Sequence, residues 1–60
     1  MSKRAVEAIF NAMFVLCDLR ILLRQTAPTH ELDDDQAIFA KKLLNQLESE
    51  VQTLKEELLK

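Results

Sequence analysis

Cysteine and histidine are the side chains here that most readily act as nucleophiles, bases or metal ligands, and the chain has one of each, Cys17 and His30. Nucleophilic catalysis needs a nucleophile beside a base that a third group orients, and the sequence offers no such set. Structural zinc sites use several Cys or His ligands, and phosphate-binding loops need glycine, which the chain lacks. Cys17 lies in an apolar stretch, where burial would blunt its reactivity. The sequence therefore predicts no enzyme, metal site, cofactor or small-molecule substrate.

Three consecutive acidic residues, Asp33, Asp34 and Asp35, are the remaining candidate for a site. A calcium-binding EF-hand loop needs alternating ligands, a glycine at the turn and a final glutamate, and this stretch lacks that pattern. Asp33 followed three residues later by Gln36 has the form of a capping box. Asp34 and Asp35 then lie in the first helical turn, where the helix dipole favours negative charge. We interpret the run as a helix start.

Composition and chain breaks predict an all-α fold, an antiparallel two-helix hairpin in one domain over residues 1–60. The chain has no glycine and one proline, and it is rich in Leu, Ala, Glu and Lys. Ser2 is the expected N-cap of a first helix over about residues 3–26, which ends because Pro28 disfavours helical geometry in the residue before it. A second helix is expected over about residues 33–59. Short connections join antiparallel neighbours.

The first helix is apolar around most of its circumference. At about 100° per residue, its polar side chains gather in one narrow seam, and about two-thirds of the surface is apolar. A surface helix usually shows a narrower apolar arc, so we expect this helix to be buried against more than one neighbour. The residues expected to face a partner are Ile9, Phe10, Met13, Phe14, Leu16, Arg20 and Leu23.

Arg20 is a charge in the middle of that apolar arc. Such a charge must be paired, or its long side chain must carry the guanidinium out to water. Two interpretations remain open at this point. Arg20 forms an interface salt bridge or extends to solvent, or it contacts an anion or an acidic partner.

The second helix has a regular apolar repeat. Its apolar residues step by three and then four positions, which is typical of a coiled-coil seam and is sustained for about three heptads. Lys42, Ser49 and Glu56 lie on the opposite face, so the second helix is amphipathic, whereas the first is not. The expected hairpin seam consists of Ala37, Ala40, Leu44, Leu47, Val51, Leu54 and Leu58.

Chain length favours association. A domain of 60 residues has a marginal core, and chains of this size usually add disulfides, a metal or a second subunit. The single cysteine rules out an internal disulfide. Burying one further Leu or Phe side chain is worth about 1.5 to 3 kcal/mol. We therefore expect two hairpins to pack their first helices together in a homodimeric four-helix bundle, or one hairpin to dock on a different protein.

The net charge of −2 is unevenly distributed. Residues 1–26 carry four basic and two acidic groups, whereas residues 27–60 carry four basic and eight acidic groups. Neither half has the one-signed positive field that is typical of nucleic-acid binding. Nucleic acid is therefore a secondary candidate for a partner, and RNA is the form to consider.

Polar residues within the first apolar stretch argue against a membrane span. Glu7, Asn11, Asp18 and Arg20 fall inside a segment that would need about 20 predominantly apolar residues to cross a bilayer. A lone cysteine fits a reducing compartment. We therefore expect a soluble, cytoplasmic protein with no membrane partner.

The hairpin outline and the motif ELDDDQ over residues 31–36 resemble the Rop family, small RNA-binding regulators of plasmid copy number. The resemblance implies an antiparallel dimeric bundle, with RNA bound across the first helices by basic, amide and Phe side chains. The positions here that could occupy such a face are Lys3, Asn11, Phe14 and Gln25. Glu7 and Asp18 share that face and repel phosphates, and the connection is longer and contains Pro28.

Three hypotheses for the function follow. The leading one is a non-enzymatic protein–protein interaction or oligomerisation module, in which a partner buries the apolar face of the first helix. The second is a Rop-like RNA-binding regulator. The third is a secretion-type chaperone or adaptor whose first helix is covered by a client protein.

Overall fold

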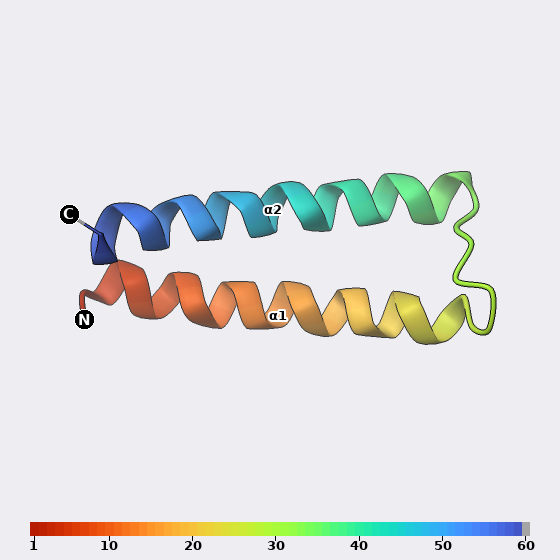
Figure 1. Cartoon of the computed structure of the whole chain (residues 1–60), viewed down its shortest axis with the longest axis horizontal. Coiled ribbons are helices and arrows are strands. Elements are labelled where there is room, and N and C mark those ends of the chain that lie inside the picture. Colours follow the sequence, from red (N-terminus) through yellow and green to blue (C-terminus); the bar gives the residue numbers. More distant parts are fainter. Residues whose placement is uncertain (60) are drawn as a thin grey trace.

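The computed structural model describes residues 1–59 and shows two α-helices, α1 over Lys3–Gln25 and α2 over Asp34–Leu58. They run antiparallel and side by side, with the two chain ends at one end of the hairpin and the connection at the other (Figure 1). The described residues form no strand. The predicted all-helical hairpin is confirmed, and each helix end lies within one residue of its expected position.

Side-chain hydroxyls close both ends of α1. The Ser2 Oγ accepts a hydrogen bond of 3.1 Å from the backbone N–H of Ala5, which confirms the expected N-cap. At the other end, Thr26 is buried, and its Oγ1 donates to the carbonyl oxygen of Leu22 at 3.0 Å. The Ala5 N–H has no acceptor within the helix. The Leu22 carbonyl also accepts from the backbone N–H of Thr26 at 3.1 Å, so the Thr26 hydroxyl is a second donor to it.

The connection folds back onto the end of α1. The backbone N–H of His30 donates to the carbonyl of Thr26 at 2.7 Å, and the His30 Nδ1 lies 3.2 Å from the carbonyl oxygen of Leu23. His30 has a φ of 58°, a left-handed conformation that histidine adopts more often than most residues with a side chain. The Ala27–Pro28 peptide bond is cis.

A capping box begins α2. The Asp33 Oδ1 accepts from the backbone N–H of Gln36 at 2.8 Å, and the Gln36 Oε1 accepts from the N–H of Asp33 at 3.0 Å. Asp34 and Asp35 lie in the first turn, near the positive end of the helix dipole. The interpretation of the acidic run as a helix start is therefore confirmed.

The two helices contact each other through a narrow line of mostly small side chains, which we call the contact stripe. Alanines near the start of α1 allow the two backbones to approach closely, and the described residues include no large side chain that is fully buried. The buried apolar residues of the stripe are Ala5, Ala8, Val15, Leu22, Ala40 and Leu43.

The predicted seam of α2 coincides only in part with the side that faces α1. Ala40 is buried and Leu47 and Leu54 are half-buried, as expected for a seam. The other four predicted seam residues are exposed, and they are Ala37, Leu44, Val51 and Leu58. The more covered positions lie one residue earlier, at Leu43, Glu50 and Glu57. The seam prediction is corrected for a physical reason, because the apolar repeat of α2 spans two neighbouring stripes and one helix covers only one of them.

The capping box gives a first testable prediction. Replacing Asp33 by Ala removes the acceptor of the Gln36 N–H and should lower the free energy of unfolding by about 1 kcal/mol, within a range of about 0.5 to 2. Asp34→Ala is the matched control, because Asp34 contributes only a helix-dipole interaction of a few tenths to about 1 kcal/mol. Urea unfolding followed by circular dichroism measures both. Equal losses for the two variants would contradict the capping role.

A candidate interaction surface

The residues of α1 predicted to face a partner are mostly uncovered in the hairpin. Ile9 is half-buried because it borders the contact stripe, and Arg20 is exposed. The five others are each more than half exposed, and they are Phe10, Met13, Phe14, Leu16 and Leu23.

Residues that directly follow the contact stripe lie on the same side of the hairpin in both helices. Successive residues turn in one sense about each helix axis, by about 100°. Relative to α1, the chain direction of α2 is reversed, and its contact stripe also faces in the opposite direction, toward α1. Each reversal alone would move the next residue to the other side of the hairpin, so the two together leave it on the same side. The residue after Val15 on α1 and the residue after Leu43 on α2 therefore point to one side.

This side of the hairpin is apolar in both helices, and we call it the apolar flank. In α1 its residues are those directly after Ala8, Val15 and Leu22. In α2 its residues are seven positions apart, beginning directly after Leu43. The apolar flank consists of Ile9, Leu16, Leu23, Leu44, Val51 and Leu58. Apart from Ile9, each of these residues is between 41% and 53% accessible. The heptad repeat predicts Leu44, Val51 and Leu58 in the seam within the hairpin, whereas the structure leaves them exposed on this flank.

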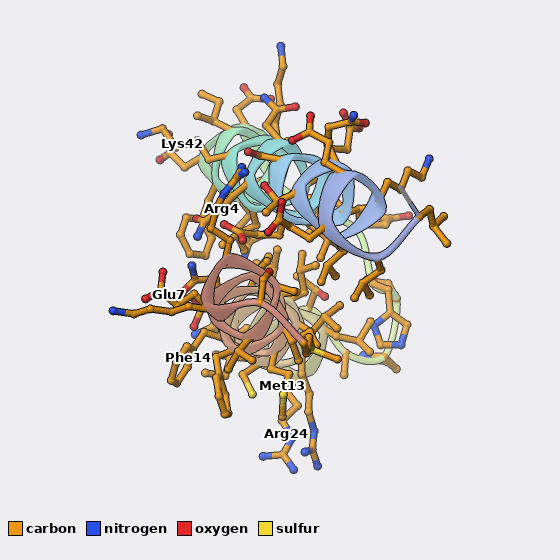
Figure 2. All side chains as sticks on the ribbon, turned by 90° about the vertical axis from the view of Figure 1, so that its left-hand side faces the viewer. Arg4, Glu7, Met13, Phe14, Arg24 and Lys42 are labelled. Atoms are coloured by element: carbon orange, nitrogen blue, oxygen red, sulfur yellow. The ribbon has the colours of Figure 1, made fainter. Side chains whose placement is uncertain are left out.

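The opposite side of the hairpin is mainly polar, and we call it the polar flank. The same helical geometry places these residues there: Arg4, Asn11, Asp18, Gln25, Phe39, Gln46 and Thr53. Seen along the hairpin, Arg4, Glu7 and Lys42 extend to this side, whereas Met13, Phe14 and Arg24 extend from α1 away from α2 (Figure 2). The hairpin thus has one apolar flank, one polar flank and a mixed outer face on α1.

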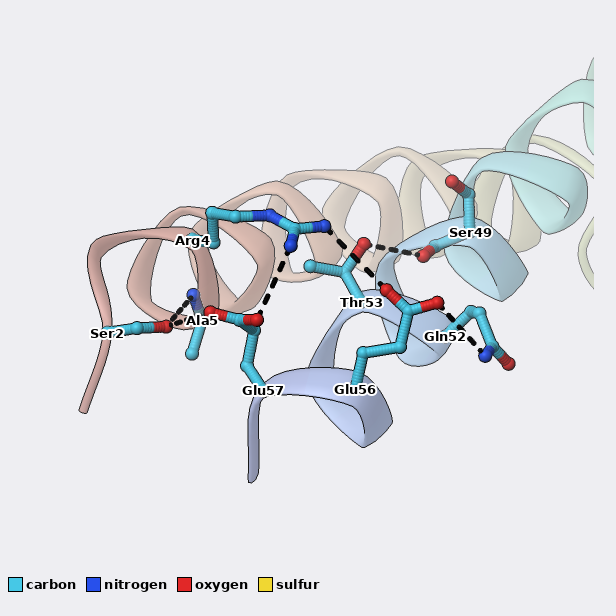
Figure 3. Close-up of polar contacts among 8 residues, drawn as sticks. All are labelled: Ser2, Arg4, Ala5, Ser49, Gln52, Thr53, Glu56 and Glu57. Carbon is cyan, nitrogen blue, oxygen red and sulfur yellow. Dashed lines mark hydrogen bonds and ion pairs between the residues drawn. The ribbon is translucent and has the colours of Figure 1, made fainter. Parts of the chain in front are cut away.

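Polar contacts at the open end join the first turn of α1 to the last turns of α2 (Figure 3). The Arg4 Nη1 lies 3.3 Å from the Glu57 Oε2, and its Nη2 lies 3.7 Å from the Glu56 Oε2. The Ser2 Oγ donates to the Glu57 Oε1 at 2.6 Å while it caps α1. The Glu57 side chain is only 11% accessible, so this carboxylate is held between the first turn of α1 and the last turns of α2.

The described residues show no built site for a small ligand. They enclose no pocket, and they bring together no group of three His, Cys, Asp or Glu side chains. Cys17, which the apolar stretch predicts to be buried, is exposed on α1, so that expectation is wrong for the hairpin. In the part of the chain that the structure describes, neither helix has both the length and the apolarity needed to cross a bilayer.

The positions that the Rop resemblance assigns to RNA are all exposed on α1. They are Lys3, Asn11, Phe14 and Gln25. Glu7 and Asp18 are exposed as well, so the structure leaves their negative charge accessible beside the same positions. Accessible carboxylates at these positions weaken the attraction of a phosphate backbone.

Comparisons with family models, curated proteins and solved structures find no match to this chain. The likeness to the Rop family therefore rests on the hairpin outline and on the residues 31–36 alone.

The open-end contacts give a second prediction. Arg4→Ala should lower the free energy of unfolding by no more than about 1 kcal/mol, because Arg4 and Glu56 are more than half exposed and water screens their attraction. High salt should reduce the difference from the original chain. Arg24→Ala is the control, because Arg24 extends away from α2 (Figure 2). A loss of several kcal/mol that salt leaves unchanged would show that the guanidinium is essential to the hairpin.

Proposed function

We propose that this chain is a non-enzymatic oligomerisation module whose apolar flank and outer α1 residues bind a protein partner. The partner that best fits is a second copy of the chain, and the assembly is a homodimeric four-helix bundle. Binding acts by removing exposed Leu, Ile, Val and Phe side chains from water, which is the main favourable term in most protein association.

One observation carries the proposal, namely the apolar flank built from both helices. Isolated apolar side chains on a surface need no explanation, but a contiguous row is typical of an interaction site. Here Leu16 and Leu23 of α1 lie on the same side as Leu44, Val51 and Leu58 of α2, and each is about half exposed. A partner that covered the apolar-flank residues of both helices would bury them in one core together with the contact stripe.

The dimensions of the hairpin support the same conclusion. Its radius of gyration is 13.6 Å, with extents of 40 × 16 × 14 Å. A compact domain of this length is expected to have a radius of gyration of about 10 Å, and one twice as long about 14 Å. Its accessible surface is 4841 Å², against about 4000 Å² expected for a compact monomer of 6.9 kDa. The surplus of about 800 Å² shows that the hairpin leaves more surface exposed than a compact monomer of its mass.

A second copy is the simplest occupant of the apolar flank. It offers an apolar flank of the same length and composition, and most soluble oligomers are symmetric dimers of one chain. A client protein would need a matching apolar row of its own. The mass of the purified chain in solution distinguishes the two, because only self-association needs no other component.

Sedimentation equilibrium tests this proposal. The chain should sediment as a dimer at micromolar concentration. Leu16→Lys and Leu44→Lys should each weaken dimerisation by about 100-fold or more, because an unpaired buried charge costs several kcal/mol and each 1.4 kcal/mol is a factor of ten. Asn11→Lys and Gln46→Lys add the same charge on the polar flank and should leave the dimer intact. A folded monomer at micromolar concentration, or equal loss from substitutions on the two flanks, would overturn the proposal.

A further inference from the structure

The side of α1 that points away from α2 is largely apolar, and we call it the outer face. Two steps of about 100° bring a residue to the opposite side of a helix, so residues two positions from the contact stripe lie here, as do residues seven positions from those. All of its apolar residues are exposed, and four of them are more than half accessible. These apolar residues are Val6, Phe10, Met13, Phe14, Cys17 and Ile21.

The charges of the outer face are mainly basic. Lys3, Arg20 and Arg24 lie on it and are exposed. Among the described residues of this face, Glu7 is the one acidic group, and it extends toward the polar flank (Figure 2). Eight of the ten acidic residues belong to residues 27–60, which include the connection and α2. The diameter of α1, about 10 Å, separates the outer face from α2 and exceeds the Debye length of about 8 Å at physiological salt.

A second copy of the chain on the apolar flank would leave most of the outer face in water. The flank residues lie one step from the contact stripe, so a copy packed there reaches only the near edge of the outer face, at Val6 and Met13. Phe10, Phe14 and Ile21 remain exposed. A contiguous apolar patch of this kind is typical of a further binding surface, which does not depend on the dimer.

We propose that the outer face binds a membrane surface that contains anionic lipids, in contrast to the expectation of no membrane partner. Polar residues within α1 argue against a span, but a helix that lies in the bilayer interface keeps its polar side in water. Phe10, Phe14 and Ile21 enter the boundary between headgroups and acyl chains. The long side chains of Arg20 and Arg24 reach the lipid phosphates.

The shape of the outer face favours a lipid surface over a protein helix. Its residues form three neighbouring stripes along α1, whereas one packed helix covers only part of such a width, as α2 does on the opposite side. The described residues enclose no pocket, so this face of a single helix offers no groove for a partner's side chains. A bilayer surface contacts all three stripes at once. Lys3 precedes the apolar residues and Arg24 follows them, so both ends of the face attract an anionic surface.

Flotation with lipid vesicles tests the proposal. The chain should bind vesicles of phosphatidylserine and phosphatidylcholine much more tightly than vesicles of phosphatidylcholine alone, and high salt should weaken the binding. Arg24→Gln should weaken it about fivefold, the usual contribution of one basic residue near an anionic leaflet. Phe14→Ser should weaken it by about tenfold or more, because Phe14 is the most exposed of the apolar residues on this face.

Lys42→Gln and Phe39→Ser are the matched controls, because they make similar changes at exposed positions of α2 and should leave vesicle binding unchanged. No binding to the anionic vesicles, equal binding to both kinds of vesicle, or equal losses in the controls would overturn the proposal. Binding to polyglutamate but not to vesicles would assign the face to an acidic protein and would also overturn it. Circular dichroism and sedimentation of each variant without lipid separate this outcome from a failure of the hairpin or of the proposed dimer.

Discussion

The narrow contact between α1 and α2 is the constraint on which the rest of the structure depends. Half of its buried apolar residues are alanine, so it removes little apolar surface from water. Val15, Leu22 and Leu43 are the only residues larger than alanine among the buried apolar side chains of the described chain. A hairpin joined in this way keeps most of its Leu, Ile and Phe side chains accessible, and that exposed apolar surface is the basis of the proposed association.

Local signals in the sequence were sufficient for the secondary structure. Ser2 and Asp33 are hydrogen-bonded caps, and Pro28 lies in the connection, because these effects depend on a few neighbouring residues. The side of α2 that packs on α1 could not be derived in the same way. A heptad repeat that includes Ala40, Leu47 and Leu54 fits equally well with one neighbour or with two, since the period contains no information on the number of partners.

The candidate surface was predicted for α1 and missed for α2. The polar residues of α1 form one narrow seam, which predicts an apolar surface wider than one neighbouring helix can cover. Phe14 and Leu16 lie on that apolar surface and are exposed in the hairpin. On α2, the apolar repeat does not include Glu50 and Glu57, because a seam is predicted from apolar residues and these two are charged. Glu57 nevertheless lies against α1, where Ser2 and Arg4 bind its carboxylate, and this leaves Leu44, Val51 and Leu58 exposed. The short side chains at the start of α1 make room for that acidic residue.

We propose that two copies of the chain associate, and the concentration dependence of thermal unfolding tests this association most directly. For a chain that folds as a dimer, mass action stabilises the folded state as the concentration rises. The account predicts that the midpoint of unfolding, followed by circular dichroism at 222 nm, rises steadily over about a hundredfold range of chain concentration. A sharp transition with the same midpoint at every concentration would contradict it, because the hairpin would then be stable alone with its apolar flank in water.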